Sequence, residues 1–194
     1  TELASRGHEL AWCGYEALLD ELLPGDAQRF GLDGDLPAGQ LEELAERART
    51  VRGLAGLKFL WEEVLLPLAR EMTPGVERVV RDFQPDVIIS DQQALAGAFV
   101  ARRAGIPWAT SATTSADRRT SLGDLPKVLA WTEERLMELQ RELELEPVHE
   151  PENSPSRVLV FSTPALCGVI PHHDERYAYV GPSLTQRPSG EAFP

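Results

Sequence analysis

Basic residues are scarce in this chain of 194 residues, in which 19 lysines and arginines stand against 31 aspartates and glutamates. The formal net charge is therefore −12. Binding to nucleic acid depends on cationic side chains that neutralise phosphates, so we expect no nucleic-acid partner. We expect no binding to an anionic membrane surface for the same reason. Lysine is the rarest basic residue, since only Lys58 and Lys127 are present.

The chain also lacks the patterns of secreted, membrane-spanning and metal-binding proteins. Its two cysteines, Cys13 and Cys167, have no pairing pattern, and we expect reduced residues of the core. No apolar run approaches the roughly 20 residues that span a bilayer, and no signal peptide is found. The adjacent His172 and His173 have no third ligand at a suitable spacing, so we expect no metal. These absences predict a cytoplasmic protein.

A glycine-rich phosphate-binding loop is missing as well. No Gly-x-Gly-x-x-Gly sequence follows a predicted strand, so the chain lacks the backbone cradle that a generic nucleotide-binding Rossmann domain needs. The chain does have a hydrophobic content of 42%. That content is enough for the core of one domain, or of one domain and part of another.

The central feature of the sequence is a strand–helix–strand pattern. Pro85 has no backbone N–H and opens a strand, and the β-branched run 87–89 shows no alternation with polar residues. Such a run is typical of a parallel strand covered by helices on both faces. Residues 92–104 follow as a helix that Gly105 ends, and residues 106–111 form the next strand. The pattern predicts an α/β fold with a parallel sheet.

Asp91 lies where the first of these strands ends. In an open α/β sheet, ligands bind at the carboxyl edge of the strands, so the position suits a binding or catalytic carboxylate. An aspartate at this place can instead be the N-cap of the helix that follows. Position alone favours the N-cap slightly, and one residue can serve both purposes.

Residues 40–83 carry apolar side chains at helical spacing. Pro67 is expected to kink or end its helix, and a break at Thr73 is expected to precede a new helix that opens at Pro74. Some large apolar residues of this region fit either an ordinary core or the wall of a ligand pocket. They are Phe59, Trp61 and Met72.

Small hydroxyl residues gather at positions 110–115, at the end of the second strand. They fit a loop that caps itself, and they fit equally a set of donors and acceptors that face a ligand. Residues 147–155 are rich in proline and acid and are predicted to be a linker. A strand of the buried type follows at residues 157–163.

Five short motifs, taken together, resemble a known family. They lie at residues 5–10, 85–91, 104–107, 158–162 and 179–182. In this order and spacing they are similar to the amino-terminal half of glycosyltransferases with the GT-B fold. The subgroup is the UDP-glucuronosyltransferase-like enzymes of bacterial natural-product and antibiotic biosynthesis, including macrolide and enediyne enzymes.

The resemblance implies a Rossmann-like, doubly wound parallel sheet. Residues 1–182 would form the acceptor-binding domain, and residues 183–194 would be a linker toward a donor-binding domain. The family's opening strand and the loop with its catalytic histidine are expected before Thr1. In the strand order 3-2-1-4-5-6, that opening strand lies beside the strand of Asp91. The nucleotide sugar is a co-substrate, so no cofactor is expected.

The resemblance also implies a mechanism and a site. A histidine takes the proton of an acceptor hydroxyl, which displaces the nucleotide with inversion, and Asp91 holds the imidazole. The acceptor is expected to be small and hydrophobic, such as a polyketide-like or aromatic compound. The expected acceptor-binding residues are Phe59, Trp61, Met72, Gln92, Ser111, Thr113, Thr114 and Trp131.

Two alternatives accompany this interpretation. A non-catalytic auxiliary protein with the same fold would also fit the sequence. A sheet without its opening strand would leave two open edges, so a truncated chain is expected to fold poorly and to be inactive alone, unless a homodimer fills the gap.

Overall fold

The computed structural model describes residues 2–32, 40–113, 122–167 and 174–182. Its helical elements are α1 (Glu2–Ser5), α2 (Glu16–Leu22), α3 (Gln40–Thr50), α4 (Gly53–Phe59), the π-helical segment η1 (Leu60–Leu65), α5 (Leu66–Phe83), α6 (Leu95–Ala104), α8 (Pro126–Glu142) and α9 (Pro164–Cys167). Its strands are β1 (Trp12–Gly14), β2 (Arg29–Gly31), β3 (Ile88–Asp91), β4 (Trp108–Ala112), β5 (Val158–Val160) and β6 (Tyr177–Tyr179).

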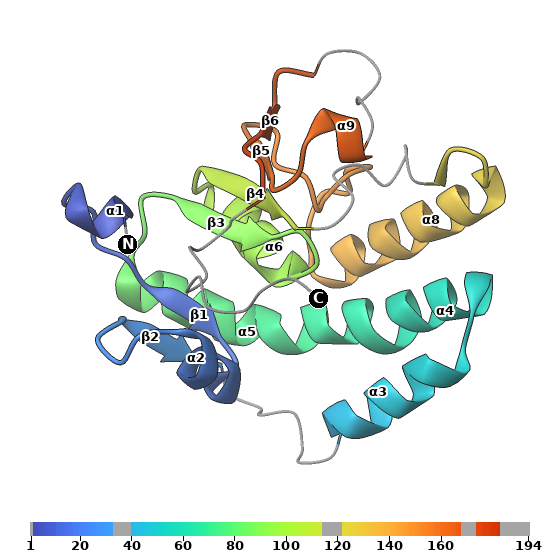
Figure 1. The fold of residues 1–194 in the computed structure, drawn as a ribbon, viewed down its shortest axis with the longest axis horizontal. Coiled ribbons are helices and arrows are strands. Elements are labelled where there is room, and N and C mark those ends of the chain that lie inside the picture. Colours follow the sequence, from blue (N-terminus) through green and yellow to red (C-terminus); the bar gives the residue numbers. More distant parts are fainter. Residues whose placement is uncertain (1, 33–39, 114–121, 168–173, 183–194) are drawn as a thin grey trace, which may run out of the picture.

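The strands form two separate parallel sheets (Figure 1). The larger sheet has the order β3-β4-β5-β6, and the smaller one pairs β1 with β2. Every pair runs parallel, and Asp91 lies opposite Ser111 in the β3–β4 register. The predicted α/β class with a parallel sheet is confirmed. Within the described residues, no strand pairs with the outer edge of β3, so β3 ends its sheet.

Helix α6 packs closely against β3 because Gly97 has no side chain. A Cβ atom at this position would lie 2.4 Å from the Oγ atom of Ser90 and 2.9 Å from its Cβ atom. The buried Ser90 hydroxyl donates to the carbonyl of Ala94, 3.0 Å away, just before α6 begins. As the sequence predicts, the helix ends at Gly105, which has a φ of 68° and so a left-handed conformation.

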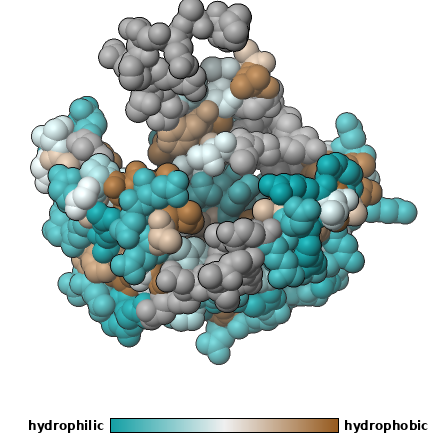
Figure 2. Space-filling model, turned by 60° about the horizontal axis from the view of Figure 1, so that its bottom comes forward, coloured by the Kyte–Doolittle hydropathy of each residue, from teal (hydrophilic) through white to brown (hydrophobic). Residues whose placement is uncertain are grey.

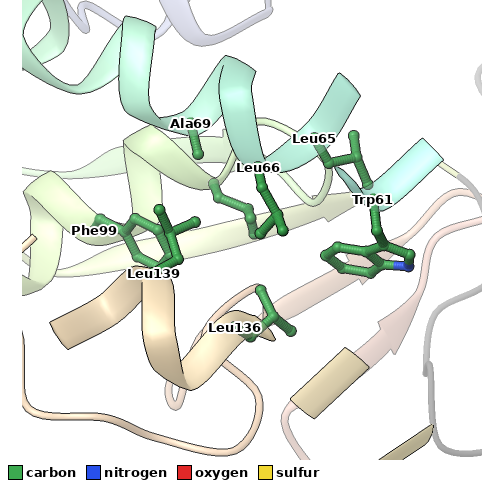
Figure 3. Close-up of a cluster of buried hydrophobic side chains, with 8 residues drawn as sticks. Trp61, Leu65, Leu66, Ala69, Phe99, Leu136 and Leu139 are labelled. Atoms are coloured by element: carbon green, nitrogen blue, oxygen red, sulfur yellow. The ribbon is translucent and has the colours of Figure 1, made fainter. Parts of the chain in front are cut away.

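The main hydrophobic core joins three helices (Figure 3). Leu65, Leu66 and Ala69 come from η1 and α5, Phe99 comes from α6, and α8 completes the cluster. Each of these residues is at most 6% exposed. Burial of several large apolar side chains at about 1.5–3 kcal/mol each explains why these three helices hold together.

The expected helix break at Thr73 and Pro74 is wrong, because α5 continues through both residues. Pro74 cannot donate to the carbonyl four residues before it, which costs about 3 kcal/mol in a helix interior. Thr73 is buried and its hydroxyl donates to the Ala69 carbonyl, 2.6 Å away. Val76 and Val79 lie in a second buried cluster with α6, and this packing offsets the lost bond. The π-helical segment η1 ends just before Pro67, the second residue of α5.

The expectation that helices cover β3 on both faces is also wrong for the described residues. Ile88 packs with Ala98 and Ala101 of α6, but Val87 and Ile89 are 56% and 55% exposed. The reason is that α5, α6 and α8 pack against one another and α6 covers the Ile88 face.

Cys13 likewise differs from expectation, since it is exposed on β1 and does not belong to the core. Its strand pairs only with the short strand β2 within the described residues. Cys167 ends α9, and its side chain lies outside the described part of the chain.

The surface reflects the acidic composition. Figure 2 shows one face of the molecule, on which hydrophilic residues predominate and hydrophobic residues form separate patches. Within the described ranges, no helix has the length and apolarity that a membrane span requires.

A Gly97→Ala substitution tests the close approach of α6 to β3. We expect it to destabilise the protein by about 1–3 kcal/mol, the usual cost of overpacking a filled core. For a protein of this size, the melting temperature falls by roughly 2–4 °C per kcal/mol. The matched control is Gly56→Ala in α4, where the nearest atoms to a new Cβ are 3.9 Å away. Equal melting temperatures for the two variants would contradict the packing described.

Asp174 and Arg176 form a pair just before β6, with the Arg176 Nε atom 2.8 Å from the Asp174 Oδ2 atom. This hydrogen bonding lowers the pKa of Asp174 from its ordinary value of 3.8. A carboxyl with a lowered folded-state pKa stabilises the fold above its unfolded pKa, and this contribution disappears as the pH falls through the folded value.

We therefore expect Asp174→Asn to reduce stability by roughly 0.2–1 kcal/mol at neutral pH, with the difference shrinking as the pH falls below 3.8 and vanishing once the pH is below the lowered pKa of the folded state. Urea unfolding at several pH values measures it. The control is Glu175→Gln, a neighbouring exposed carboxylate for which no such change is expected. A loss of stability that is constant with pH would contradict the role of the charge.

Candidate functional site

Asp91 ends β3 with an exposed side chain, and both of its carboxylate oxygens are oriented by the protein. The backbone N–H of Gln93 donates to Oδ1 at 2.8 Å, and the Thr113 hydroxyl donates to Oδ2 at 3.2 Å. Because Asp91 and Ser111 are paired, Thr113 follows β4 at the same edge of the sheet. The parallel register therefore brings the two strand ends together at one place.

The N-cap interpretation of Asp91 does not hold. Helix α6 begins at Leu95, its N-cap is Ala94, and no side chain caps it. Asp91 instead accepts from the residue two positions ahead, which fixes the turn between β3 and α6. A carboxylate oxygen has more than one acceptor site, so each oxygen can accept a further hydrogen bond from a group outside the chain.

Gln92 lies beside Asp91, but its side chain is held from another direction. Its amide donates to Oδ1 of Asn153 at 2.8 Å, and the Asn153 amide donates to the Tyr177 hydroxyl at 3.2 Å. These two hydrogen bonds link the turn after β3 to β6. Asn153 is the only asparagine of the sequence and is 4% exposed. The sequence interpretation missed it, because nothing near position 153 indicates a partner 61 residues away.

The hydroxyl residues at positions 110–113 have separate roles. Thr110 is fully buried and donates to the Glu152 carbonyl at 3.0 Å, while it accepts from the Ser154 N–H at 2.8 Å. It anchors the segment that was predicted to be a linker, and residues 151–154 are buried there. Ser111 is half-buried opposite Asp91. Thr114 lies outside the described residues.

The large apolar candidates do not gather at one place. Trp61 belongs to the main core at 8% exposure, and Met72 packs against the cluster of Leu32 and Val76. The Arg47 guanidinium lies 5.1 Å from the centre of the Phe59 ring. Trp131 is half-buried and lines a hollow between α4 and α8.

That hollow, which we call the α4–α8 pocket, has a volume of about 330 Å³. Its lining consists of Leu54, Leu57, Lys58, Lys127, Val128 and Trp131. Helix α8 comes after the end of β4 in the chain. Helix α4 begins the helical run α4–η1–α5, and the other end of this run leads into β3. Both therefore lie on the side toward which the strands of the larger sheet run (Figure 1).

Metal ligands do not gather in the structure. Over residues 2–32, 40–113, 122–167 and 174–182, no group of three histidine, cysteine, aspartate or glutamate side chains is placed to hold a metal ion.

Comparison with known proteins agrees with this fold. Among curated sequences, 4'-demethylrebeccamycin synthase from Lentzea aerocolonigenes is 25% identical over 115 residues, which are 58% of this chain and 27% of that protein. No family model matches the chain.

Solved structures of antibiotic glycosyltransferases are similar over most of the chain. The glycosyltransferase of kitacinnamycin has a TM-score of 0.66 and 20% identity over 100% of this chain and 49% of that one. The calicheamicin glycosyltransferase CalG4 has a TM-score of 0.59 and 20% identity, and the match covers 94% of this chain and 46% of that one. The glycosyltransferase SsfS6 from Streptomyces sp. SF2575 has a TM-score of 0.57 and 18% identity, and the match covers 84% of this chain and 45% of that one.

The chain thus has the fold of a partial GT-B glycosyltransferase, as its five motifs predict. It spans about half the length of the solved structures it matches and about a quarter of the curated relative.

Asn153→Ala tests whether the hydrogen bonds that join Gln92, Asn153 and Tyr177 hold the turn beside Asp91. Removing a buried side chain with two hydrogen bonds should cost about 1–3 kcal/mol of unfolding free energy, measured by urea titration. Gln93→Ala is the control, because the exposed Gln93 contributes its backbone N–H, which the substitution keeps. A change below about 0.5 kcal/mol for both variants would argue against the anchoring role.

Proposed function

We propose that this chain is the acceptor-binding part of an inverting glycosyltransferase, which moves a sugar from a nucleotide sugar to a hydroxyl group of a small hydrophobic natural product. The observation that carries the proposal is the exposed Asp91 carboxylate at the carboxyl edge of a parallel strand. Both of its oxygens are already oriented, by the Gln93 N–H and the Thr113 hydroxyl.

In the proposed reaction, a base removes the proton of the acceptor hydroxyl as its oxygen attacks the anomeric carbon. The bond from that carbon to the nucleotide breaks, and the nucleotide leaves with the electron pair. A histidine from outside residues 1–194 acts as the base. Asp91 accepts a hydrogen bond from the other ring nitrogen and stabilises the imidazolium that forms.

The pre-oriented carboxylate suits this role physically. An imidazole gains general-base strength only if one tautomer and one ring orientation are held, so its partner carboxylate must have a fixed direction. The two hydrogen bonds to Asp91 supply that direction before any partner binds. Neither donor carries a positive charge, so neither competes with the imidazolium as an ion-pair partner of the carboxylate.

The choice of substrates is supported by the compared proteins. SsfS6 was solved with thymidine diphosphate, which supports a nucleoside diphosphate sugar as the donor here. The relatives named after kitacinnamycin and calicheamicin support a natural-product acceptor. The apolar lining of the α4–α8 pocket fits an acceptor of this kind.

Asp91→Asn in the complete enzyme tests the proposal. We expect kcat to fall about 10²–10⁴-fold, since an amide cannot stabilise the imidazolium, while the KM for the acceptor and the melting temperature stay nearly unchanged. Release of the nucleoside diphosphate, measured with a panel of aromatic and polyketide acceptors, provides the rate.

The matched control is Asp86→Asn, which removes an exposed carboxylate two residues before β3, at the opposite edge of the sheet. Full activity of the Asp91→Asn enzyme would remove Asp91 from the mechanism. If the unaltered protein transferred no sugar but bound a glycosyltransferase, the non-catalytic auxiliary interpretation would replace the proposal.

A further inference from the structure

The α4–α8 pocket contains both lysines of the chain. Lys58 comes from α4 and Lys127 from the first turn of α8, so residues 69 positions apart in the sequence (127 − 58) line one hollow. The remainder of the pocket is apolar: Leu54, Leu57 and Val128 with the ring of Trp131. The chain has a net charge of −12, yet the charged side chains among the described lining residues are both positive.

We propose that the pocket binds an apolar, aromatic or polyketide-like body that carries a carboxylate, and that Lys58 and Lys127 select this anionic form of the ligand. The inference rests on the proposed function, because it assigns a charge to the class of acceptor. An acceptor without an acid group would gain no charge pairing from either lysine.

The lysine side chain suits this arrangement. Its aliphatic stem lies along apolar surface while the ammonium group stays in water, so each lysine can extend the apolar wall and place a charge at its rim. Lys58 has one carboxylate nearby, Glu62, whose Oε2 atom is 3.6 Å from Nζ. This pair is exposed, at 64% and 36%, so the ammonium group remains accessible to a ligand. Within the described residues, no ion pair joins Lys127 to a carboxylate.

The first turn of α8 strengthens the positive field. This helix of 17 residues begins at Pro126, and its N-cap, Leu125, offers no side-chain acceptor. The positive end of the helix dipole therefore adds to the charge of Lys127. Trp131, one turn further along, lines the pocket and supplies an aromatic ring for contact with an aromatic ligand.

The size and chemistry of the pocket favour a small aromatic acid over a nucleotide. A volume of about 330 Å³ lies at the lower end of the range for ligand pockets, roughly 300–1,000 Å³. Among the described residues that line the pocket, no side chain can accept a hydrogen bond from the hydroxyl groups of a ribose, because the two lysines and the indole N–H of Trp131 are donors only. A bicyclic aromatic carboxylate fits both the volume and the charge.

The test compares 2-naphthoate with the neutral 2-naphthamide, which has nearly the same shape. Binding to the complete protein is measured by calorimetry at low salt. We expect naphthoate to bind roughly fivefold more tightly, since exposed charge pairs contribute up to about 1 kcal/mol. About 0.5 M salt should reduce this preference to less than twofold.

Lysine-specific ¹³C labelling locates the binding. The signals of Lys58 and Lys127, assigned by Lys58→Gln and Lys127→Gln, should both shift with naphthoate, and at saturation by more than with naphthamide. The double variant should bind acid and amide equally well. Arg141→Gln is the matched control, because it removes a positive charge from the same helix at a different hollow. It should keep the preference for the acid.

Several results would overturn the inference. These are equal binding of acid and amide by the unaltered protein, a preference that survives in the double variant, and lysine shifts caused by thymidine diphosphate instead of naphthoate. The test needs no sugar transfer. A preference for the acid with no transfer to any acceptor would sink the proposed function alone, whereas transfer to acid and amide acceptors with equal KM would sink this inference alone.

Discussion

The structure depends on the close contact between α6 and β3, where the missing side chain of Gly97 makes room for Ser90. The contact determines where β3 ends and how the chain turns into α6. Asp91 occupies that turn, and the parallel register with β4 brings Thr113 to the same edge. A carboxylate with two oriented oxygens is thus a direct consequence of helix–strand packing and strand pairing.

Buried polar contacts hold the segment between α8 and β5 in place. Gln140 is fully buried in α8 and exchanges two hydrogen bonds with the backbone of Val148, at 2.9 and 3.0 Å. It also accepts from Arg102 of α6 at 2.7 Å, and burial lowers the pKa of that guanidinium. Thr110 and Ser154 continue the anchoring across β4. These bonds hold the segment between α8 and β5 against the face of the larger sheet that α6 also covers.

Local signals predicted the parts of the fold that depend on local chemistry. Pro85, the β-branched run that follows it and Gly105 identified β3, α6 and β4, and the end of β3 located Asp91. Contacts between distant residues decided the rest. Pro74 stays inside α5 because Val76 and Val79 pack against α6, and no local pattern reveals that energy. Asn153 and the pairing of Lys58 with Lys127 in one pocket are invisible for the same reason.

The central claim is that the carboxylate of residue 91 faces the reacting hydroxyl of an acceptor through one intervening imidazole. A crystal structure of the complete protein with a bound acceptor measures this directly. The account predicts an Asp91 oxygen within about 2.6–3.2 Å of an imidazole N–H whose other nitrogen faces that hydroxyl. An Asp91 side chain open to solvent, with the acceptor bound elsewhere and no imidazole beside it, would contradict the account.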